Sequence, residues 1–142
     1  MKTAVLSFGQ FMKEREGVAQ AYVQGDAEPL GRIVTHAGKA TFFGPQGGHR
    51  EGANEVASTY ARDAKSFEPG GTSSLEILQM GESEGIAYWV GFQHATARMH
   101  GKADAIPMKL RVTEVFRLED DEWKLVHRHA DALAGETEKK LG

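Results

Sequence analysis

Hydrophobic residues in the first part of the chain recur at the spacing of a helix. Within residues 3–24 they fall three or four positions apart on one stripe, and charged residues fill the opposite side. The stripe consists of Phe8, Phe11, Met12, Val18, Ala19, Tyr22 and Val23. Gly25 is placed to end this helix, and Asp26 to cap a second, short helix with Pro29 in its first turn. We therefore predict two helices that meet at a corner.

The pattern then changes from helical spacing to alternation. Residues 40–43 predict a short strand, and residues 52–67 predict a third helix after a glycine-rich turn. After Pro69-Gly70-Gly71, apolar and polar residues alternate until about Asp131. Breaks near residues 83–85, 102–106 and 119–122 divide this region into four strands of an antiparallel meander. Helices followed by long strands predict an α+β fold, in which the helices cover one face of a curved sheet.

The composition of the chain excludes several classes of function. A length of 142 residues predicts one domain, residues 1–142, with a frayed polar tail from about residue 135. With 17 basic and 20 acidic residues and no basic stripe, nucleic acid is not an expected partner. The first residues have the pattern of a helix rather than a signal peptide, and no apolar stretch reaches the roughly 20 residues of a membrane span. We expect a cytoplasmic protein without cysteine chemistry, since the chain has no cysteine.

Three segments resemble the SnoaL-like, ketosteroid-isomerase-related proteins of the nuclear-transport-factor-2-like (NTF2-like) superfamily. Residues 35–45, followed by Gly47-Gly48, are similar to the first-strand region of that family, and residues 110–117 and 123–131 are similar to its last two strands. The resemblance covers roughly residues 8–131. It implies a cone-shaped fold whose curved sheet wraps around N-terminal helices. The superfamily includes isomerases, dehydratases, cyclases and non-catalytic association domains, so it does not imply one reaction.

The chain departs from ketosteroid isomerases at the positions that carry their chemistry. Their general base is a carboxylate before the proline that follows the first strand, and here Gly44 precedes Pro45. The tyrosine of their first helix falls near Val18, where it has no match. The acid on their penultimate strand has a counterpart in Glu114. The resemblance therefore implies an isomerase-like or lyase-like pocket without the usual first-strand carboxylate.

Glu114 and His127 form the candidate catalytic pair. If the last hairpin turns at Asp120 and Asp121, Glu114 faces His127 on the apolar side of the sheet, whereas a one-residue bulge would move His127 away. A carboxylate beside an imidazole suits proton transfer next to a carbonyl. Pairing without chemistry is the slightly preferred interpretation, because buried polar residues are usually paired in any case.

The remaining candidate residues would line a pocket for a small, partly hydrophobic ligand. They are Phe43, Tyr88, Phe92, His94, Phe116, Trp123 and His129. Which side of the strand containing Tyr88 and His94 faces the pocket stays open, because the loop at residues 102–106 leaves the register undetermined. His127 and His129 point the same way and would need Glu114, His94 or Asp131 as a third metal ligand, but we expect neither a metal nor another cofactor.

Two functions follow from these observations. The first is a homodimer whose pocket binds a small hydrophobic molecule and carries out isomerisation, dehydration or cyclisation by proton transfer. The second is a non-catalytic ligand carrier or self-association module that uses the sheet as its contact surface. The missing first-strand carboxylate favours the second function, and the Glu114 and His127 pair favours the first.

Overall fold

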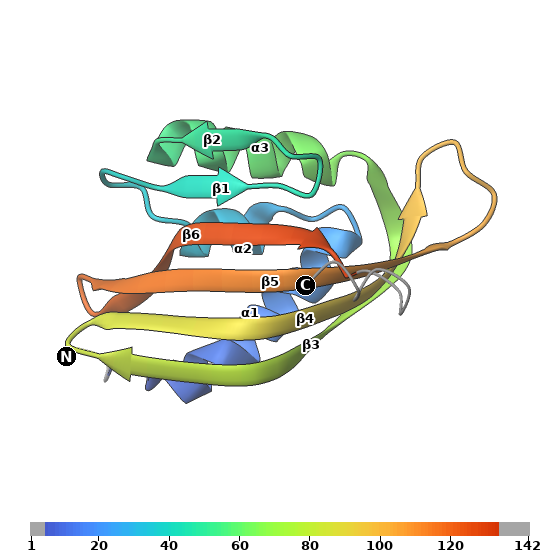
Figure 1. Ribbon diagram of the computed structural model, residues 1–142. Coiled ribbons are helices and arrows are strands. Elements are labelled where there is room, and N and C mark those ends of the chain that lie inside the picture. Colours follow the sequence, from blue (N-terminus) through green and yellow to red (C-terminus); the bar gives the residue numbers. More distant parts are fainter. Residues whose placement is uncertain (1–4, 134–142) are drawn as a thin grey trace.

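The computed structural model describes residues 5–133, in which a curved sheet of six strands packs against three helices (Figure 1). In chain order the elements are α1 (Phe8–Val23), α2 (Glu28–Ile33), β1 (Thr41–Phe43), β2 (His49–Glu51), α3 (Ala53–Ala64), β3 (Phe67–Ser83), β4 (Ile86–Met99), β5 (Ile106–Glu119) and β6 (Glu122–Ala132). The predicted α+β class is confirmed. The predicted frayed tail from about residue 135 lies outside the described residues.

Local signals explain both ends of α1. The Ser7 side chain accepts a hydrogen bond from the Gln10 backbone, and the Gln10 side chain accepts one from Ser7, which together form a capping box. After the helix, Gly25 has a φ of 94°. A Cβ atom there would lie 2.8 Å from the Phe67 carbonyl oxygen, so glycine is needed for both its conformation and its lack of a side chain. The predicted corner between α1 and α2 is therefore specified locally.

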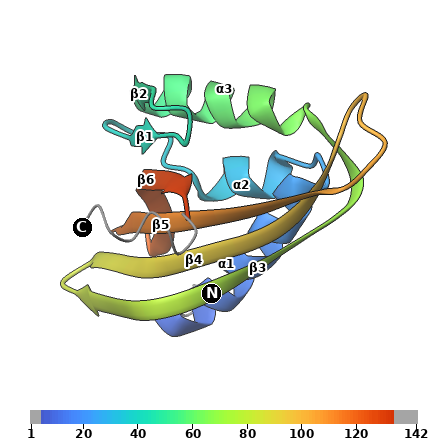
Figure 2. The same cartoon turned by 45° about the vertical axis from the view of Figure 1, so that its right-hand side comes forward.

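The strands lie in the order β2-β1-β6-β5-β4-β3. The four-stranded meander from β3 to β6 is antiparallel, as predicted. The sheet is not antiparallel throughout, because β1 pairs with β6 in parallel. The prediction from the sequence also lacks β2, whose three residues are all exposed and show no alternation. Figure 2 shows α2 between the long strands and α3, with β1 and β2 beside α3.

Pro69, Gly70 and Gly71, which the sequence places before the first long strand, instead lie within it, in β3. This segment forms an irregularity between Glu68 and Thr72 in the pairing with β4. Because β3 is an edge strand, a proline that donates no backbone hydrogen bond is tolerated there. The break that the sequence predicts is therefore a bulge in a strand of 17 residues.

A bulge in β6 changes the face of every later residue in that strand. Phe116 pairs with Leu125 as predicted, but Val115 pairs with His127, so Val126 is the extra residue. Beyond it, Glu114 pairs with Arg128 instead of His127. Leu125 bridges to Val34 and His127 pairs with Thr41, so the bulge lies where β6 changes its neighbour.

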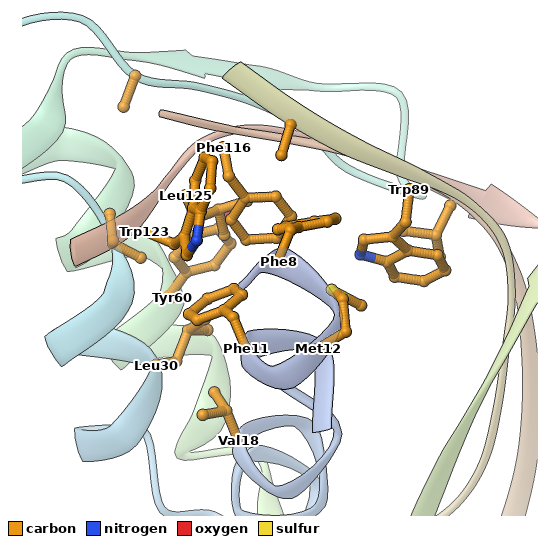
Figure 3. Close-up of a cluster of buried hydrophobic side chains, with 14 of the residues drawn as sticks. Phe8, Phe11, Met12, Val18, Leu30, Tyr60, Trp89, Phe116, Trp123 and Leu125 are labelled. Atoms are coloured by element: carbon orange, nitrogen blue, oxygen red, sulfur yellow. The ribbon is translucent and has the colours of Figure 1, made fainter. Parts of the chain in front are cut away.

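The core lies between α1 and the concave face of the sheet. Phe8, Phe11, Phe116 and Trp123 form one aromatic group with ring centroids 5.2 to 6.0 Å apart (Figure 3). The Trp123 indole nitrogen donates to the Leu6 carbonyl over 3.0 Å, which satisfies its polar atom. This group fixes the position of α1 on the sheet.

Candidate functional site

A cavity of about 160 Å³ lies between the helices and the concave face of the sheet. Its apolar lining comes from α1, α2, β1, β5 and β6 and includes Ala19, Leu30, Phe42, Leu110 and Ala130. Its polar lining residues are Arg15, Asp63, Gln93 and Arg128, together with the phenols Tyr22 and Tyr60. Pockets for drug-sized ligands measure roughly 300–1,000 Å³, so this cavity suits a smaller molecule.

A second, more open cavity of about 390 Å³ adjoins the first. The two share Phe42, Pro45, Asp63 and Phe67, and the loop at residues 44–48 contributes to the second. The second cavity therefore lies beside the first, between β1 and the C-terminal part of α3.

Glu114 is fully buried behind the first cavity and accepts hydrogen bonds from three side chains. Arg15 donates through Nε to Oε1 over 3.0 Å and through Nη2 to Oε2 over 2.8 Å. The Trp89 indole nitrogen donates to Oε1 over 2.7 Å, and Arg128 Nη1 donates to Oε2 over 2.7 Å. We call Arg15, Trp89, Glu114 and Arg128 the Glu114 cluster.

The bulge in β6 is what brings Arg128 into this cluster. Without the extra residue, strict alternation from Leu125 would put His127 on the concave face and Arg128 on the convex face. With it, Arg128 points inward with only 11% of its side chain exposed. Its second nitrogen, Nη2, donates to Gln93 Oε1 over 2.8 Å, and Gln93 in turn donates to Ser73 Oγ over 3.1 Å.

The surroundings of Glu114 keep it ionised. Burial raises the pKa of this carboxyl, but the charges of Arg15 and Arg128 and their hydrogen bonds outweigh burial and lower the pKa to about 2. A carboxylate with every oxygen engaged in this way neither donates nor accepts a proton near neutral pH. Burial also raises the pKa values of Tyr22 and Tyr60, so both phenols stay protonated and act as donors.

Two donors at the cavity have no hydrogen-bond partner among the described residues. They are Arg15 Nη1 and the Tyr60 hydroxyl, both on buried side chains. A buried donor without a partner is costly in free energy, so native proteins contain few of them. Tyr22, by contrast, donates its hydroxyl to the Tyr60 carbonyl over 3.0 Å.

The predicted pair of Glu114 and His127 is separated by the sheet. His127 lies on the convex face, where its Nδ1 is 2.6 Å from Thr41 Oγ1 and its ring is 5.0 Å from that of Phe43. Burial and the charge of His129 lower the pKa of His127. His129 is also on the convex face, 5.5 Å from the Phe43 ring. The predicted contact is wrong because of the bulge, and neither histidine lines the cavity.

The other predicted pocket residues also lie outside the cavity. Tyr88, Phe92 and His94 are on the convex side of β4, where His94 Nε2 is 2.9 Å from Glu76 Oε1. The buried residues of β4 are the alternate set that includes Trp89 and Gln93. Phe43 is 41% exposed on the convex face, and Phe116 and Trp123 belong to the aromatic core.

Sequence reasoning missed Arg15, Tyr60, Gln93 and Arg128. A signal existed for Arg15, which falls three residues after Met12 and three before Val18 on the apolar stripe of α1. A charged residue on a buried stripe predicts a buried ion pair. Tyr60 lies on the buried stripe of α3, where its phenol brings a polar hydroxyl into the core, whereas Arg128 had no such signal because its position depends on the bulge.

Two further observations concern metals and membranes. Within residues 5–133, histidine, cysteine, aspartate and glutamate side chains nowhere form a group of three or more that could hold a metal ion. In the same part of the chain, no helix combines the length and the apolar character needed to cross a membrane.

Comparison with known proteins identifies relatives by sequence family and by fold. A family model described as a SnoaL-like domain matches residues 16–134. The comparison with curated proteins finds no match. A candidate dehydratase of the NTF2-like family from Streptomyces avermitilis is 20% identical with a TM-score of 0.72, over 89% of this chain and 96% of that chain.

Two other solved structures show how widely this fold is used. A candidate ketosteroid isomerase from Parabacteroides distasonis is 16% identical with a TM-score of 0.64, over 87% of this chain and 86% of that chain. A candidate calcium/calmodulin-dependent protein kinase type II association domain from Thiobacillus denitrificans is 11% identical with a TM-score of 0.68, over 94% of this chain and 100% of that chain. At these identities the likeness shows the fold and leaves the reaction open.

Proposed function

This chain belongs to the SnoaL-like domain family, and from that premise we propose that it binds a small, partly hydrophobic molecule in the cavity beside the Glu114 cluster. The observation that carries the proposal is the combination of an apolar cavity with two unpartnered donors in its wall. Ligand sites combine an apolar lining with a few polar groups that orient the ligand in this way.

The binding function is tested by filling the cavity. A screen of short-chain and aromatic ketones, amides and carboxylates by protein NMR should find ligands that shift the signals of Tyr60 and Ala130. The Ala19→Leu variant places a larger side chain in the cavity and should abolish these shifts. Ala61→Leu, the same change at an exposed position of α3, is the control. Binding that survives Ala19→Leu, or a screen without ligands, would contradict the proposal.

Proton transfer next to a carbonyl is the second candidate function, and Asp63 is the residue that favours it. It lines both cavities, and half of its side chain is exposed, with Arg62 Nε as a distant partner at 3.7 Å. In this reaction Asp63 would take a proton from the carbon next to the ligand's carbonyl. The electron pair would move to the carbonyl oxygen, where Arg15 and Tyr60 would stabilise the charge before the proton returns.

Hydrogen exchange into the ligand tests this reaction. A bound ketone incubated in heavy water should gain deuterium at the carbon next to its carbonyl, as measured by mass spectrometry. The Asp63→Asn variant should lower the rate on the order of 100-fold, because general bases contribute factors of this size. Exchange at an unchanged rate in Asp63→Asn would assign the base elsewhere, and absence of exchange would leave binding as the function.

We also propose that the convex face of the sheet packs against a second copy of the chain. Leu78, Tyr88 and Phe43 are 58%, 37% and 41% exposed there. The Arg111–Asp131 ion pair and the contact of His94 with Glu76 lie among these apolar side chains, so the face carries groups of both charges. A face that carries both signs is able to pair with itself across a two-fold axis. Analytical ultracentrifugation should give a dimer for the wild type and a monomer for Leu78→Asp, and a monomeric wild type would contradict this proposal.

A further inference from the structure

The charges around the cavity do not balance. The Glu114 cluster contains two guanidinium groups and one carboxylate, and the side chains of Arg15 and Glu114 are 4% and 0% exposed. Asp63, the acidic residue in the cavity lining, is half exposed, so water screens its charge. Excess positive charge in a buried site is unfavourable unless an anion accompanies it.

The unpartnered donors lie where an anion would need them. Arg15 uses Nε and Nη2 on Glu114, and its remaining nitrogen, Nη1, has no partner among the described residues. Tyr60 comes from α3, across the cavity from the sheet, and its hydroxyl also has no partner in that part of the chain. Both residues line the same cavity. One oxygen-bearing group would therefore satisfy two donors from two different helices.

We propose that the ligand of this cavity is a small carboxylate with an apolar body, whose oxygens accept hydrogen bonds from Arg15 Nη1 and the Tyr60 hydroxyl. This inference rests on the proposed binding function and adds the chemical class of the ligand. Glu114 has a positioning role, because it holds both guanidinium groups in place. A neutral carbonyl would satisfy the two donors as well, but it would leave the excess positive charge without a counterion.

Matched pairs of carboxylates and primary amides separate these two ligand types. Butyrate with butyramide, benzoate with benzamide, and phenylacetate with phenylacetamide have nearly equal shapes within each pair and differ in charge. Binding to the full chain is measured by calorimetry at low salt and by NMR. We expect at least one carboxylate to bind about tenfold or more tightly than its amide, since hydrogen bonds to charged groups are about twice as strong as neutral ones.

Tyr60→Phe tests the assigned donor without removing any hydrogen bond within the described protein. The affinity of the Tyr60→Phe variant for the carboxylate should fall about tenfold, while its affinity for the amide should change less. Tyr88→Phe is the matched control on the convex face, where the hydroxyl donates to Gln79 Oε1 over 3.1 Å, and it should leave affinity unchanged.

The possible results separate the two proposals. If amides bind as tightly as carboxylates, the carboxylate inference is wrong and the binding function stands. If carboxylates bind but Tyr60→Phe has no effect, the assigned donor site is wrong. If no member of any pair binds, the proposed binding function fails and this inference fails with it.

Discussion

Two ion pairs join β5 to β6 over nearly equal distances but in opposite surroundings. On the concave face, Arg128 donates to Glu114 over 2.7 Å, and Glu114 is fully buried. On the convex face, Arg111 donates to Asp131 over 2.7 and 2.8 Å, and 61% of the Arg111 side chain is exposed. A buried pair is costly to break because the remaining charge has no water around it, whereas an exposed pair is easily replaced by hydration. Burial and the number of further hydrogen bonds, rather than the donor–acceptor distance, decide how much each pair contributes to stability.

The largest expected difference comes from removing one carboxylate on each face. Glu114→Gln should lower the free energy of unfolding by about 3–5 kcal/mol, because it leaves the charges of Arg15 and Arg128 buried without a carboxylate. Asp131→Asn should cause little loss. Urea unfolding of both variants measures the contrast. Equal losses in the two variants would show that the faces do not differ in this way.

Acid should affect the concave face through Glu114. The pKa of this carboxyl is about 2 in the folded protein against an ordinary value of 4.5, so the unfolded chain takes up the proton first. The stability it contributes is complete above about pH 4.5 and is lost as the pH falls towards 2, with a total of about 3 kcal/mol. Urea unfolding at several pH values measures this loss. The Asp131→Asn variant should show most of the same loss of stability at low pH. A free energy of unfolding that does not change with pH in the wild type would contradict the prediction.

Replacing one arginine on each face by methionine extends the comparison. Arg128→Met should lower the free energy of unfolding by about 2 kcal/mol, because it removes donors to Glu114 and Gln93 but leaves the Arg15 pair intact. Arg111→Met on the convex face should have no measurable effect. Thermal and urea unfolding together provide the measurement, and a larger loss for Arg111→Met would reverse the assignment of the two faces.

The smallest expected effect is a gain in stability rather than a loss. Tyr60→Phe removes a buried hydroxyl without a described partner, so it should raise the free energy of unfolding of the ligand-free protein by about 1 kcal/mol. Tyr88→Phe, on the convex face, should leave stability unchanged or slightly lower, since it loses a bond to Gln79. A loss of stability in Tyr60→Phe would mean that its hydroxyl is satisfied in solution.

The fold was predictable from the sequence because its signals are local and repeated. Helical spacing placed α1, glycine and proline placed the corner before α2, and alternation placed the four long strands. The same reasoning misjudged Pro69-Gly70-Gly71, since whether such residues end a strand or bulge within it depends on the neighbouring strand. It missed β2 because three exposed polar residues show no pattern.

The candidate site was less predictable because it depends on one inserted residue. The sequence correctly placed Glu114 on the concave face, but Val126 changes the pairing, so that Arg128 replaces His127 beside it. Strict alternation has no means of revealing such a residue. Arg15 was accessible to the same reasoning, because it interrupts an apolar stripe, but its partner lies 99 residues away along the chain. The residue types therefore indicated that Glu114 and Arg15 are buried, but they did not indicate which residues these two contact.

The parallel pairing of β1 with β6 also determines when the cavity can form. Thr41 and His127 lie next to each other in the sheet but 86 residues apart in the chain. Contacts over such separations form late, because the intervening chain must first be ordered. Phe42 from β1 and Arg128 from β6 are both parts of the cavity wall. During synthesis on the ribosome, a ligand of this cavity would therefore have no binding site until β6 has emerged, and it would stabilise the finished fold rather than guide its early steps.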